Sequence, residues 1–433
     1  MVKIKKLLNF VNPQKGPIEK IYPNVLYNDE PKIYLFTACV KNTIRLTDGF
    51  SVGKFAVGSS FSKEKALLKA MGEALERFSI SIYRRKYLIW RSYKDLKNKK
   101  INAINPKHFI TFSKPKRKPT FRLYKKESDK LYWTKGFSLI QNKNIFVPAQ
   151  FVFVPYRFKS TEPTIRTPIS TGAACYGSLN GAILKGLLEV IERDAYMISY
   201  LNKLSRNIID ISNSKDEIFR KITNSIKRYN LEVYFLDISS DVPVYTILSI
   251  VIDKTGYGPA VSLGINSSLN LKDAIVGSFE ELLHGRFWIR DSMFNQSTKK
   301  IKEIQEKRAP ISIFDLKERG LYWSQPRMIK KIKFFLEGKK ILVKNLPIKK
   351  TRNLNTLIKW FKNNKHEVIY VETTPAHIKK NKIYTVRILI PEFQPLCLDE
   401  RFSYLDGERL KSVPLKLKLK SLKILNRVPQ PFM

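Results

Sequence analysis

Three segments of this chain place pairs of polar side chains in one repeated frame. In each segment a glutamate follows an alanine by seven residues, and a second polar residue lies three positions further on. The pairs are Glu73 and Glu76 after Ala66, Glu189 and Glu192 after Ala182, and Glu281 and His284 after Ala274. Because helix positions i and i+3 share a face, each segment would present two clustered polar groups. Buried carboxylates repel one another and lose hydration, and a hard cation such as Mg²⁺ compensates for both effects.

The elements that position these groups are predicted to be three helices. A residue type that caps helices precedes each alanine by four positions, namely Ser62, Ser178 and Asn270. Leucine, isoleucine and alanine recur between them at the spacing of a buried helix face. A single Glu-x-x-Glu-Arg segment would be a solvated helix face with an ion pair. Three copies in one frame instead favour three helices that converge on one site.

The composition indicates a folded protein with a strongly basic surface. The chain has 433 residues, of which 43% are hydrophobic, and its formal net charge is +43. The lysines and arginines are spread along nearly the whole chain, so we expect a diffuse positive surface without sequence-specific nucleic-acid binding. A non-catalytic scaffold or nucleic-acid-associated protein is the alternative that this charge leaves open.

The hydrophobic pattern predicts no association with a membrane. No apolar run approaches the roughly 18 residues of a membrane span. The apolar stretch near the N-terminus is too short for a signal peptide, so we expect a cytoplasmic protein. The three cysteines, Cys39, Cys175 and Cys397, lie too far apart in sequence to indicate a disulfide framework or a zinc site.

Strand-like and helix-like segments alternate, which predicts an α/β fold with mixed sheets packed by helices. Strand patterns occur at residues 36–40, 55–58, 133–139, 145–156 and 384–391, and we expect two strands within 231–266. We divide the chain into an N-terminal strand and loop region, 1–50, and a catalytic domain, 51–433. The small residues after Ser170 and Thr171 would let the backbone before the second helix approach a phosphate closely.

The last residues of the sequence include Pro429, Gln430, Pro431 and Phe432. One interpretation is a frayed tail, which is common at chain ends. The alternative is a segment inserted into a pocket, because proline-fixed backbone loses less entropy when it becomes ordered.

These motifs together resemble the YcaO family, whose members bind ATP and phosphorylate a peptide-bond oxygen. The resemblance rests on residues 72–79, on 170–174 with 188–194, and on 281–286, and it extends over roughly residues 20–433. Residues 131–139, 147–150 and 390–396, and the proline-containing end, resemble the azoline-forming cyclodehydratases of thiazole/oxazole-modified peptide pathways. His284 departs from the family pattern, which usually has glutamine there.

The resemblance implies a YcaO-type fold with an ATP site built from the three repeated helices. Mg²⁺ would be held against ATP by Glu73, Glu76, Glu189, Glu192 and Glu281, and the nucleotide would contact Ser170, Thr171, Arg77, Arg193, His284 and Arg286. For Arg77 an ion pair with Glu73 or Glu76 is the alternative, and for His284 it is a satisfied core histidine. Pro429, Pro431 and Phe432 would act in catalysis by positioning the substrate or a proton-transfer group.

The reaction implied is ATP-dependent conversion of cysteine, serine or threonine in a ribosomal precursor peptide to thiazoline or (methyl)oxazoline. A related alternative is peptide thioamide formation, against which the C-terminal prolines argue. We expect a separate leader-binding partner protein and a separate flavin dehydrogenase. The sequence leaves the oligomeric state open, a homodimer included.

Overall fold

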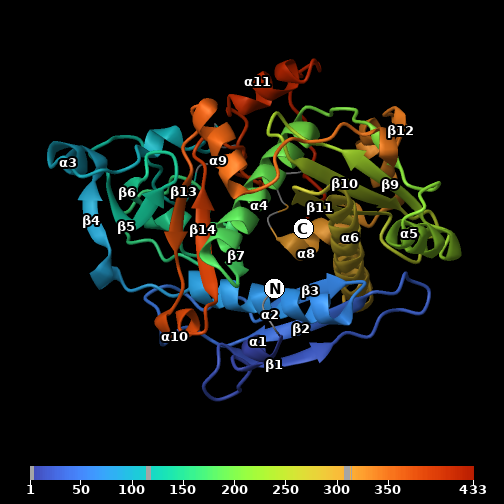
Figure 1. The fold of residues 1–433 in the computed structure, drawn as a ribbon, viewed down its shortest axis with the longest axis horizontal. Coiled ribbons are helices and arrows are strands. Elements are labelled where there is room, and N and C mark those ends of the chain that lie inside the picture. Colours follow the sequence, from blue (N-terminus) through green and yellow to red (C-terminus); the bar gives the residue numbers. More distant parts are fainter. Residues whose placement is uncertain (1–3, 114–118, 307–312, 314) are drawn as a thin grey trace.

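Three β-sheets and the helices packed on them surround the middle of the molecule (Figure 1). The structure is a computed structural model, and it describes residues 4–113, 119–306, 313 and 315–433. It confirms the predicted α/β class. Within the described residues, no helix is both long and apolar enough to cross a membrane.

The first sheet is antiparallel and lies at the bottom of Figure 1. Its strands are β1 (Ile18–Pro23), β2 (Tyr34–Val40) and β3 (Phe55–Ser60). Strand β2 pairs with both of the others, so this sheet joins residues from both sides of the division we placed at residue 50.

The second sheet has the order β4-β5-β13-β14-β7, with β6 paired to β5, and its pairs are antiparallel. Its strands are β4 (Ile89–Ser92), β5 (Lys130–Ser138), β6 (Lys143–Pro148), β7 (Ala173–Tyr176), β13 (Ile369–Glu372) and β14 (Tyr384–Leu389). Strand β14, from late in the chain, thus lies beside β7, which leads into the second predicted helix.

The third sheet has the order β11-β10-β9-β8-β12 and is mixed, because β12 pairs with β8 in parallel. Its strands are β8 (Ile208–Asp210), β9 (Glu232–Asp237), β10 (Tyr245–Ile252), β11 (Val261–Ser268) and β12 (Lys340–Leu342). The expectation of two strands within 231–266 was wrong, since β9, β10 and β11 all begin there. Every residue of β10 is buried, so no alternation in the sequence separates this strand from its neighbours.

The helices include the three that the repeated frame predicts, α2 (Lys63–Ile80), α4 (Leu179–Leu201) and α6 (Leu271–Phe294). The other α-helices are α1 (Ile4–Leu8), α3 (Tyr93–Asn98), α5 (Glu217–Arg228), α7 (Thr298–Glu306), α8 (Leu316–Trp323), α9 (Leu354–Asn363), α10 (Ala376–Lys379) and α11 (Arg409–Lys416). The predicted caps are confirmed, because the side chains of Ser62, Ser178 and Asn270 each accept a backbone N–H from the first turn.

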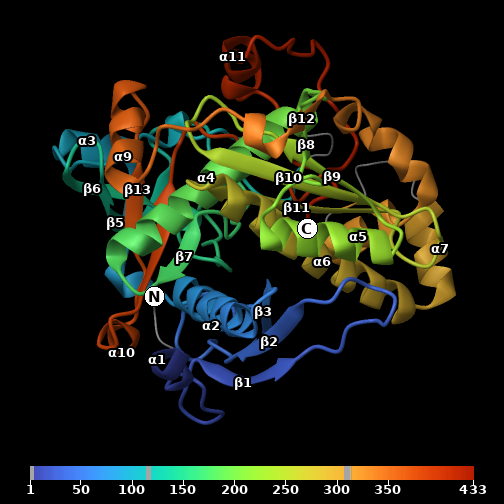
Figure 2. The same ribbon diagram turned by 45° about the vertical axis from the view of Figure 1, so that its right-hand side comes forward.

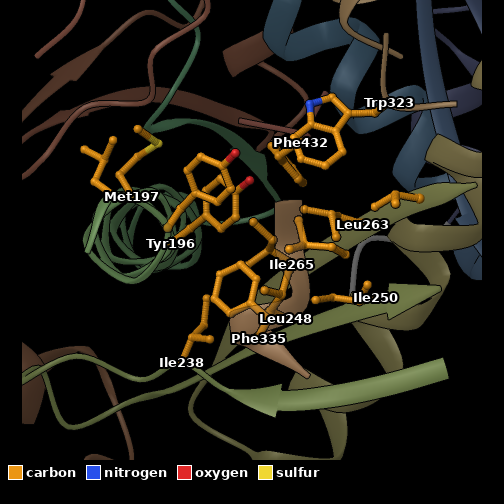
Figure 3. Packing of buried hydrophobic residues seen from close by; sticks show 14 of the residues in the cluster. Tyr196, Met197, Ile238, Leu248, Ile250, Leu263, Ile265, Trp323, Phe335 and Phe432 are labelled. Carbon is orange, nitrogen blue, oxygen red and sulfur yellow. The ribbon is translucent and has the colours of Figure 1, made fainter. Parts of the chain in front are cut away.

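A large hydrophobic cluster joins α4, the third sheet and the C-terminal residues. Tyr196 of α4 points toward Ile265 of β11 in this cluster (Figure 3), to which Met197 and Leu263 also belong. Phe432, which is 3% exposed, belongs to the same cluster and lies beside Trp323 (Figure 3). The C-terminal segment is therefore part of the core and is not a frayed tail.

Candidate active site

The repeated sequence frame corresponds to a repeated strand–helix unit. Strand β3 leads into α2, β7 into α4 and β11 into α6, with two residues between strand and helix in each case. Figures 1 and 2 show these three helices around the middle of the molecule. The structure thus brings together helices that are separated by about a hundred residues in the chain.

In each unit the first glutamate accepts a backbone N–H from just before or within its own strand. Val57 donates to Glu73 Oε2 over 2.9 Å, Gly172 to Glu189 Oε2 over 3.2 Å, and Ile265 to Glu281 Oε2 over 3.0 Å. One oxygen of each carboxylate is thereby fixed in direction by the backbone.

Two glycines allow the close packing that this arrangement needs. A Cβ at Gly58 would lie 2.2 Å from Ala66 O, and one at Gly264 would lie 2.1 Å from Ser278 O. Any side chain at either position would push the helix away from its strand. The glycines therefore allow the short strand-to-helix distance at which the glutamate carboxylates can accept their backbone N–H bonds.

The second glutamates complete the group of carboxylates. Glu192 is buried, and its Oε2 accepts the N–H of Ser267 over 2.8 Å, which ties α4 to β11. Burial raises the pKa of Glu76 to about 8, with Lys185 opposing the shift and Glu189 and Glu73 adding to it. The charge of Glu189 on α4 thus helps to raise the pKa of Glu76 on α2.

The pKa values of the remaining carboxylates are raised in the same way. Burial raises the pKa of Glu189, Glu192 and Glu281, while Arg193 opposes the shift at each of them. Glu281 and Glu189 raise the pKa of Glu192 further. Negative charge on this group is therefore costly without a bound cation.

Arg193 is the cation that the structure places among these carboxylates. It lies 2.9 Å from Glu192 and 3.7 Å from Glu189, and its side chain is 12% exposed. Burial disfavours its charge, but Glu192, Glu281 and Glu189 together raise its pKa. The Phe432 ring centroid lies 4.2 Å from the Arg193 guanidinium carbon, which is close enough for a cation–π contact.

Arg77 and His284 lie at the edge of the group. Arg77 binds Glu73 at 2.7 Å, so the structure shows the ion pair that was the alternative to a phosphate contact. Burial lowers the pKa of His284 to about 4, with Glu73 opposing the shift, and the imidazole is neutral at physiological pH. Within the described residues the imidazole of His284 has no hydrogen-bond partner, and the residue is partly exposed, so its contact with phosphate stays a prediction.

Arg286 lies in a different network, which does not support its predicted contact with phosphate. Its guanidinium binds Glu30 over 2.7 Å, Asp253 over 2.6 Å and the carbonyl of Pro259 over 3.1 Å. Arg286 follows its alanine by twelve residues, whereas Arg77 and Arg193 follow theirs by eleven. One extra residue turns a side chain by about 100° around a helix, so Arg286 faces away from the frame that the other two share.

The C-terminal segment reaches the carboxylate group through Phe432 and is held by buried polar contacts. The carbonyl of Pro429 accepts from Trp323 Nε1 over 3.0 Å and from the Tyr200 hydroxyl over 3.1 Å. Gln430 accepts from the Tyr196 hydroxyl over 3.1 Å, and Arg319 donates to its carbonyl over 2.6 Å. Pro429 and Pro431 are buried as well. No motif in the sequence predicted this anchoring by Tyr196, Tyr200, Arg319 and Trp323.

The turn before α4 has the backbone geometry that a close approach requires. Gly172 adopts a positive φ of 88°, and its N–H is the donor to Glu189. Ser170 is exposed and Thr171 is partly buried, so both border the solvent-accessible side of this turn. Their contact with a phosphate stays a prediction.

The donor set fits Mg²⁺ in its chemistry. As the described side chains are placed, no three histidine, cysteine, aspartate or glutamate residues close around one point. Mg²⁺ commonly takes only one or two carboxylates and fills its octahedron with water and phosphate oxygens. The raised pKa values of Glu76, Glu189, Glu192 and Glu281 mark carboxylates that gain stability when a cation binds.

Comparison with known proteins gives a family match over most of the chain. A family model described as a YcaO cyclodehydratase that binds ATP and Mg²⁺ matches residues 57–394. A curated relative, an uncharacterized protein of Methanothermobacter thermautotrophicus, is 26% identical over 157 residues, which are 36% of this chain and 41% of that protein. The chain thus matches less than half the length of this relative.

Solved structures share the fold at low sequence identity. A heterocyclase in complex with substrate and cofactor has a TM-score of 0.76 at 16% identity, over 99% of this chain and 56% of that one. YcaO from Methanopyrus kandleri, bound with AMPPCP and Mg²⁺, has a TM-score of 0.61 at 14% identity, over 94% of each chain. The E. coli microcin synthetase McbBCD complex with pro-MccB17 bound has a TM-score of 0.62 at 14% identity, over 98% of this chain and 99% of that one.

Proposed function

Because the chain belongs to the YcaO family of ATP- and Mg²⁺-binding cyclodehydratases, we propose that it converts cysteine, serine or threonine residues of a ribosomally made peptide to azolines. The observation that carries this proposal is the convergence of three carboxylate-bearing helices: Glu189 of α4 raises the pKa of Glu76 of α2, and Glu281 of α6 raises that of Glu192 of α4. Phe432 of the C-terminal segment contacts Arg193 within this group. A nucleotide site alone would not need a buried C-terminal segment beside it.

The proposed reaction removes one carbonyl oxygen from the peptide. The side-chain sulfur or oxygen attacks the preceding carbonyl carbon. The resulting oxyanion attacks the γ-phosphorus of ATP, whose bond to the β,γ-bridging oxygen breaks as ADP leaves. The carbonyl oxygen then leaves as part of inorganic phosphate, and the side-chain proton and the amide proton are released as the C=N bond forms. To catalyse these steps, the protein must position ATP and the peptide and stabilise the charge that develops on the oxyanion and the phosphate. It need not form a covalent bond to either.

We assign these tasks to the residues that the structure groups together. The oxygens of Glu76, Glu189 and Glu281 that do not accept backbone N–H groups would hold Mg²⁺, which neutralises phosphate charge. Glu192 would join them once Arg193, which lies 2.9 Å from its second oxygen, turns to the phosphate. Glu73 would contribute more weakly, because Arg77 already neutralises its other oxygen. Arg193 would contact a phosphate oxygen with its planar guanidinium.

The C-terminal segment would place the reacting amide beside this group. Phe432 packs on Arg193, so the position of the segment and that of the arginine depend on each other. Pro429 and Pro431 keep the backbone of the segment preorganised.

We propose a precursor peptide as substrate, together with a separate leader-binding protein and a flavin dehydrogenase that oxidises azolines. The similar microcin synthetase structure is a complex that holds pro-MccB17, which supports a requirement for partner chains.

The test combines ATP turnover with peptide mass. The protein is incubated with Mg·ATP and a cysteine-containing precursor peptide encoded beside its gene, together with the partner proteins encoded there. We expect ADP release that depends on the peptide and the loss of one water per ring. Replacement of one oxygen by sulfur would assign the reaction to thioamide formation instead, and the absence of turnover with every peptide would favour the scaffold alternative.

A matched pair of variants links this activity to the site. Glu192→Gln keeps an oxygen for the Ser267 N–H but removes the charge, so it should abolish turnover. Glu64→Gln changes an exposed glutamate on α2 and should leave turnover unchanged. Equal turnover of the Glu192 variant and the wild type would contradict the assignment of the carboxylate group.

A further inference from the structure

A small cavity with two arginines lies beside the carboxylate group, between strand β14 and the turn before α4. Its volume is about 40 Å³. Arg166 and Arg387 line it, as do Thr171, Val190 and Gln394. Thr171 precedes the glycine that donates to Glu189, and Val190 follows Glu189 in α4. The cavity thus adjoins the carboxylate group through the backbone on both sides of Glu189.

Arg387 is buried and has an unused donor group. It is 4% exposed, and its Nε donates to the carbonyl of Phe151 over 2.9 Å. Its Nη2 donates to the carbonyl of Ile169, while its Nη1 is buried and has no partner. A buried cationic N–H without an acceptor loses its hydration without compensation, so it marks a place where an acceptor is missing.

Arg166 supplies a second positive charge to the same cavity. Its guanidinium carbon lies 4.9 Å from the ring centroid of Phe151 and 5.6 Å from that of Phe109. Neither Arg166 nor Arg387 forms an ion pair with a carboxylate within the described part of the chain. Burial lowers the pKa of each arginine to about 10, so both stay charged at neutral pH.

The charge around the cavity favours a small anion. No aspartate or glutamate lines it, and its other lining residues are apolar, threonine or glutamine. Glu189 and Glu76 raise the pKa of Arg387, and Arg166 lowers it, so Arg387 interacts electrostatically with both the carboxylate group and the second arginine. The buried Arg387 and the partly exposed Arg166 repel each other unless an anion lies near both.

The size of the cavity limits the anion to a few heavy atoms. A volume of about 40 Å³ holds roughly three water molecules, since one water needs about 10–15 Å³. Drug-sized ligands and nucleotides need pockets of about 300–1,000 Å³. A tetrahedral oxyanion or a carboxylate group fits, and a nucleotide does not.

We propose that this cavity is a subsite for orthophosphate and receives the phosphate that the reaction releases. The proposal rests on the proposed function, because only phosphoryl transfer at the carboxylate group generates phosphate there. Arg387 would turn its free Nη1 to the anion, and Arg166 would donate to it through the N–H groups in the plane of its guanidinium, which stacking on the rings leaves free. Charge-assisted bonds from two guanidinium groups suit a tetrahedral oxyanion.

The test is an equilibrium titration that needs neither turnover nor peptide. Orthophosphate is titrated into the protein by calorimetry at physiological ionic strength, without ATP. We expect one saturable site per chain, for which sulfate competes and acetate does not. Arg166→Gln should weaken this binding by at least about tenfold, because it removes one charge-assisted partner. Arg91→Gln, at an exposed position outside the cavity, should leave it unchanged.

Two further measurements separate this site from the nucleotide site and from misfolding. The Arg166 variant should bind Mg·ATP as the wild type does and unfold at the same temperature, because Arg166 makes no side-chain hydrogen bond within the described residues. Arg387 is less suitable, since it also holds the carbonyls of Phe151 and Ile169.

Three results would overturn the proposal: no saturable binding of phosphate, equal phosphate binding by the Arg166 variant, or tighter binding of acetate than of phosphate. The last result would assign the cavity to a substrate carboxylate. If the wild type did not bind Mg·ATP, that result would contradict the proposed function, and the phosphate titration could still be interpreted.

Discussion

Glu76→Gln should stabilise the metal-free protein at pH 8 and at the same time remove its response to Mg·ATP. The side chain of Glu76 lies among Glu73 and Glu189, and burial raises its pKa to about 8 from an ordinary value of 4.5. In the unfolded chain the same carboxyl ionises near pH 4.5. Between these two values the folded protein holds a proton that the unfolded chain releases, so the free energy of unfolding falls as pH rises.

The magnitude follows from the difference between the two pKa values. One unit is about 1.4 kcal/mol, so the whole difference gives an upper limit of about 5 kcal/mol above pH 8. Glu76 is only partly buried, so solvent screens its charge and we expect about half of this limit. Glutamine has no charge to lose hydration. The variant should therefore be more stable than the wild type by about 2 kcal/mol at pH 8 and show little difference near pH 4.5.

The assay is denaturant unfolding at pH 5 and pH 8 in EDTA, repeated with saturating Mg·ATP. A ligand at 100 times its Kd stabilises the folded state by about 2.7 kcal/mol, and the wild type should show a gain of this order. The Glu76 variant should show little of it. Glu64→Gln on the same helix is the control, and it should shift stability by at most about 0.5 kcal/mol. A variant less stable than the wild type at pH 8 without metal, or equally stabilised by Mg·ATP, would refute the reasoning.

Two further variants examine the arginines. Phe432→Leu keeps an apolar side chain in the core but removes the ring from Arg193. Because a cation–π contact contributes about 0.5–2 kcal/mol, its loss should lower kcat by about 2- to 30-fold. Nucleotide affinity should change little. Steady-state kinetics and ATP titration measure this, and an unchanged kcat would separate Phe432 from the chemistry. Arg286→Met leaves Asp253 buried without its cation, whereas Glu30 keeps its ion pair with Arg290 at 2.7 Å. The variant should reduce the free energy of unfolding by about 3 kcal/mol; an unchanged denaturation midpoint would contradict the structural role given to Arg286.

Local sequence signals predicted the helices and their carboxylates well. The caps Ser62, Ser178 and Asn270 act within one turn, and the glutamates sit at fixed distances from them, so neither feature depends on the tertiary fold. The repeated frame also predicted that α2, α4 and α6 converge. Their identical pattern would bury polar groups in three places if the helices did not share one site.

Tertiary partners could not be predicted in the same way. Arg286 lies one residue further from its alanine than Arg193 does, so its side chain points in another direction from the helix. There it binds Glu30 and Asp253, which lie in loops without any repeated pattern. Arg387 is one basic residue among 80 in the sequence, and only the pairing of β14 with β7 brings it beside Gly172. The strand count of the third sheet failed for a related reason, because a strand buried on both faces shows no periodicity.

The backbone N–H groups that hold the glutamates explain how the fold tolerates this concentration of charge. Each of these bonds favours the ionised form, yet burial still raises the pKa of Glu189, Glu192 and Glu281, so the bonds do not compensate for lost hydration. What they do provide is direction, because an oxygen fixed by Gly172 or Ile265 leaves the other oxygen of the same carboxylate without a backbone partner. Ser267 fixes one oxygen of Glu192 in the same way, and the other oxygen lies 2.9 Å from Arg193. Arg193 is one positive charge among these carboxylates, and the remaining imbalance can be relieved by protons or by a divalent cation. The metal-free protein therefore holds protons where the working enzyme would hold Mg²⁺, and binding of the ion should release them. Proton release on addition of Mg·ATP in weakly buffered solution should accordingly be smaller in Glu76→Gln than in the wild type, because that variant has lost a carboxyl whose pKa is raised to about 8.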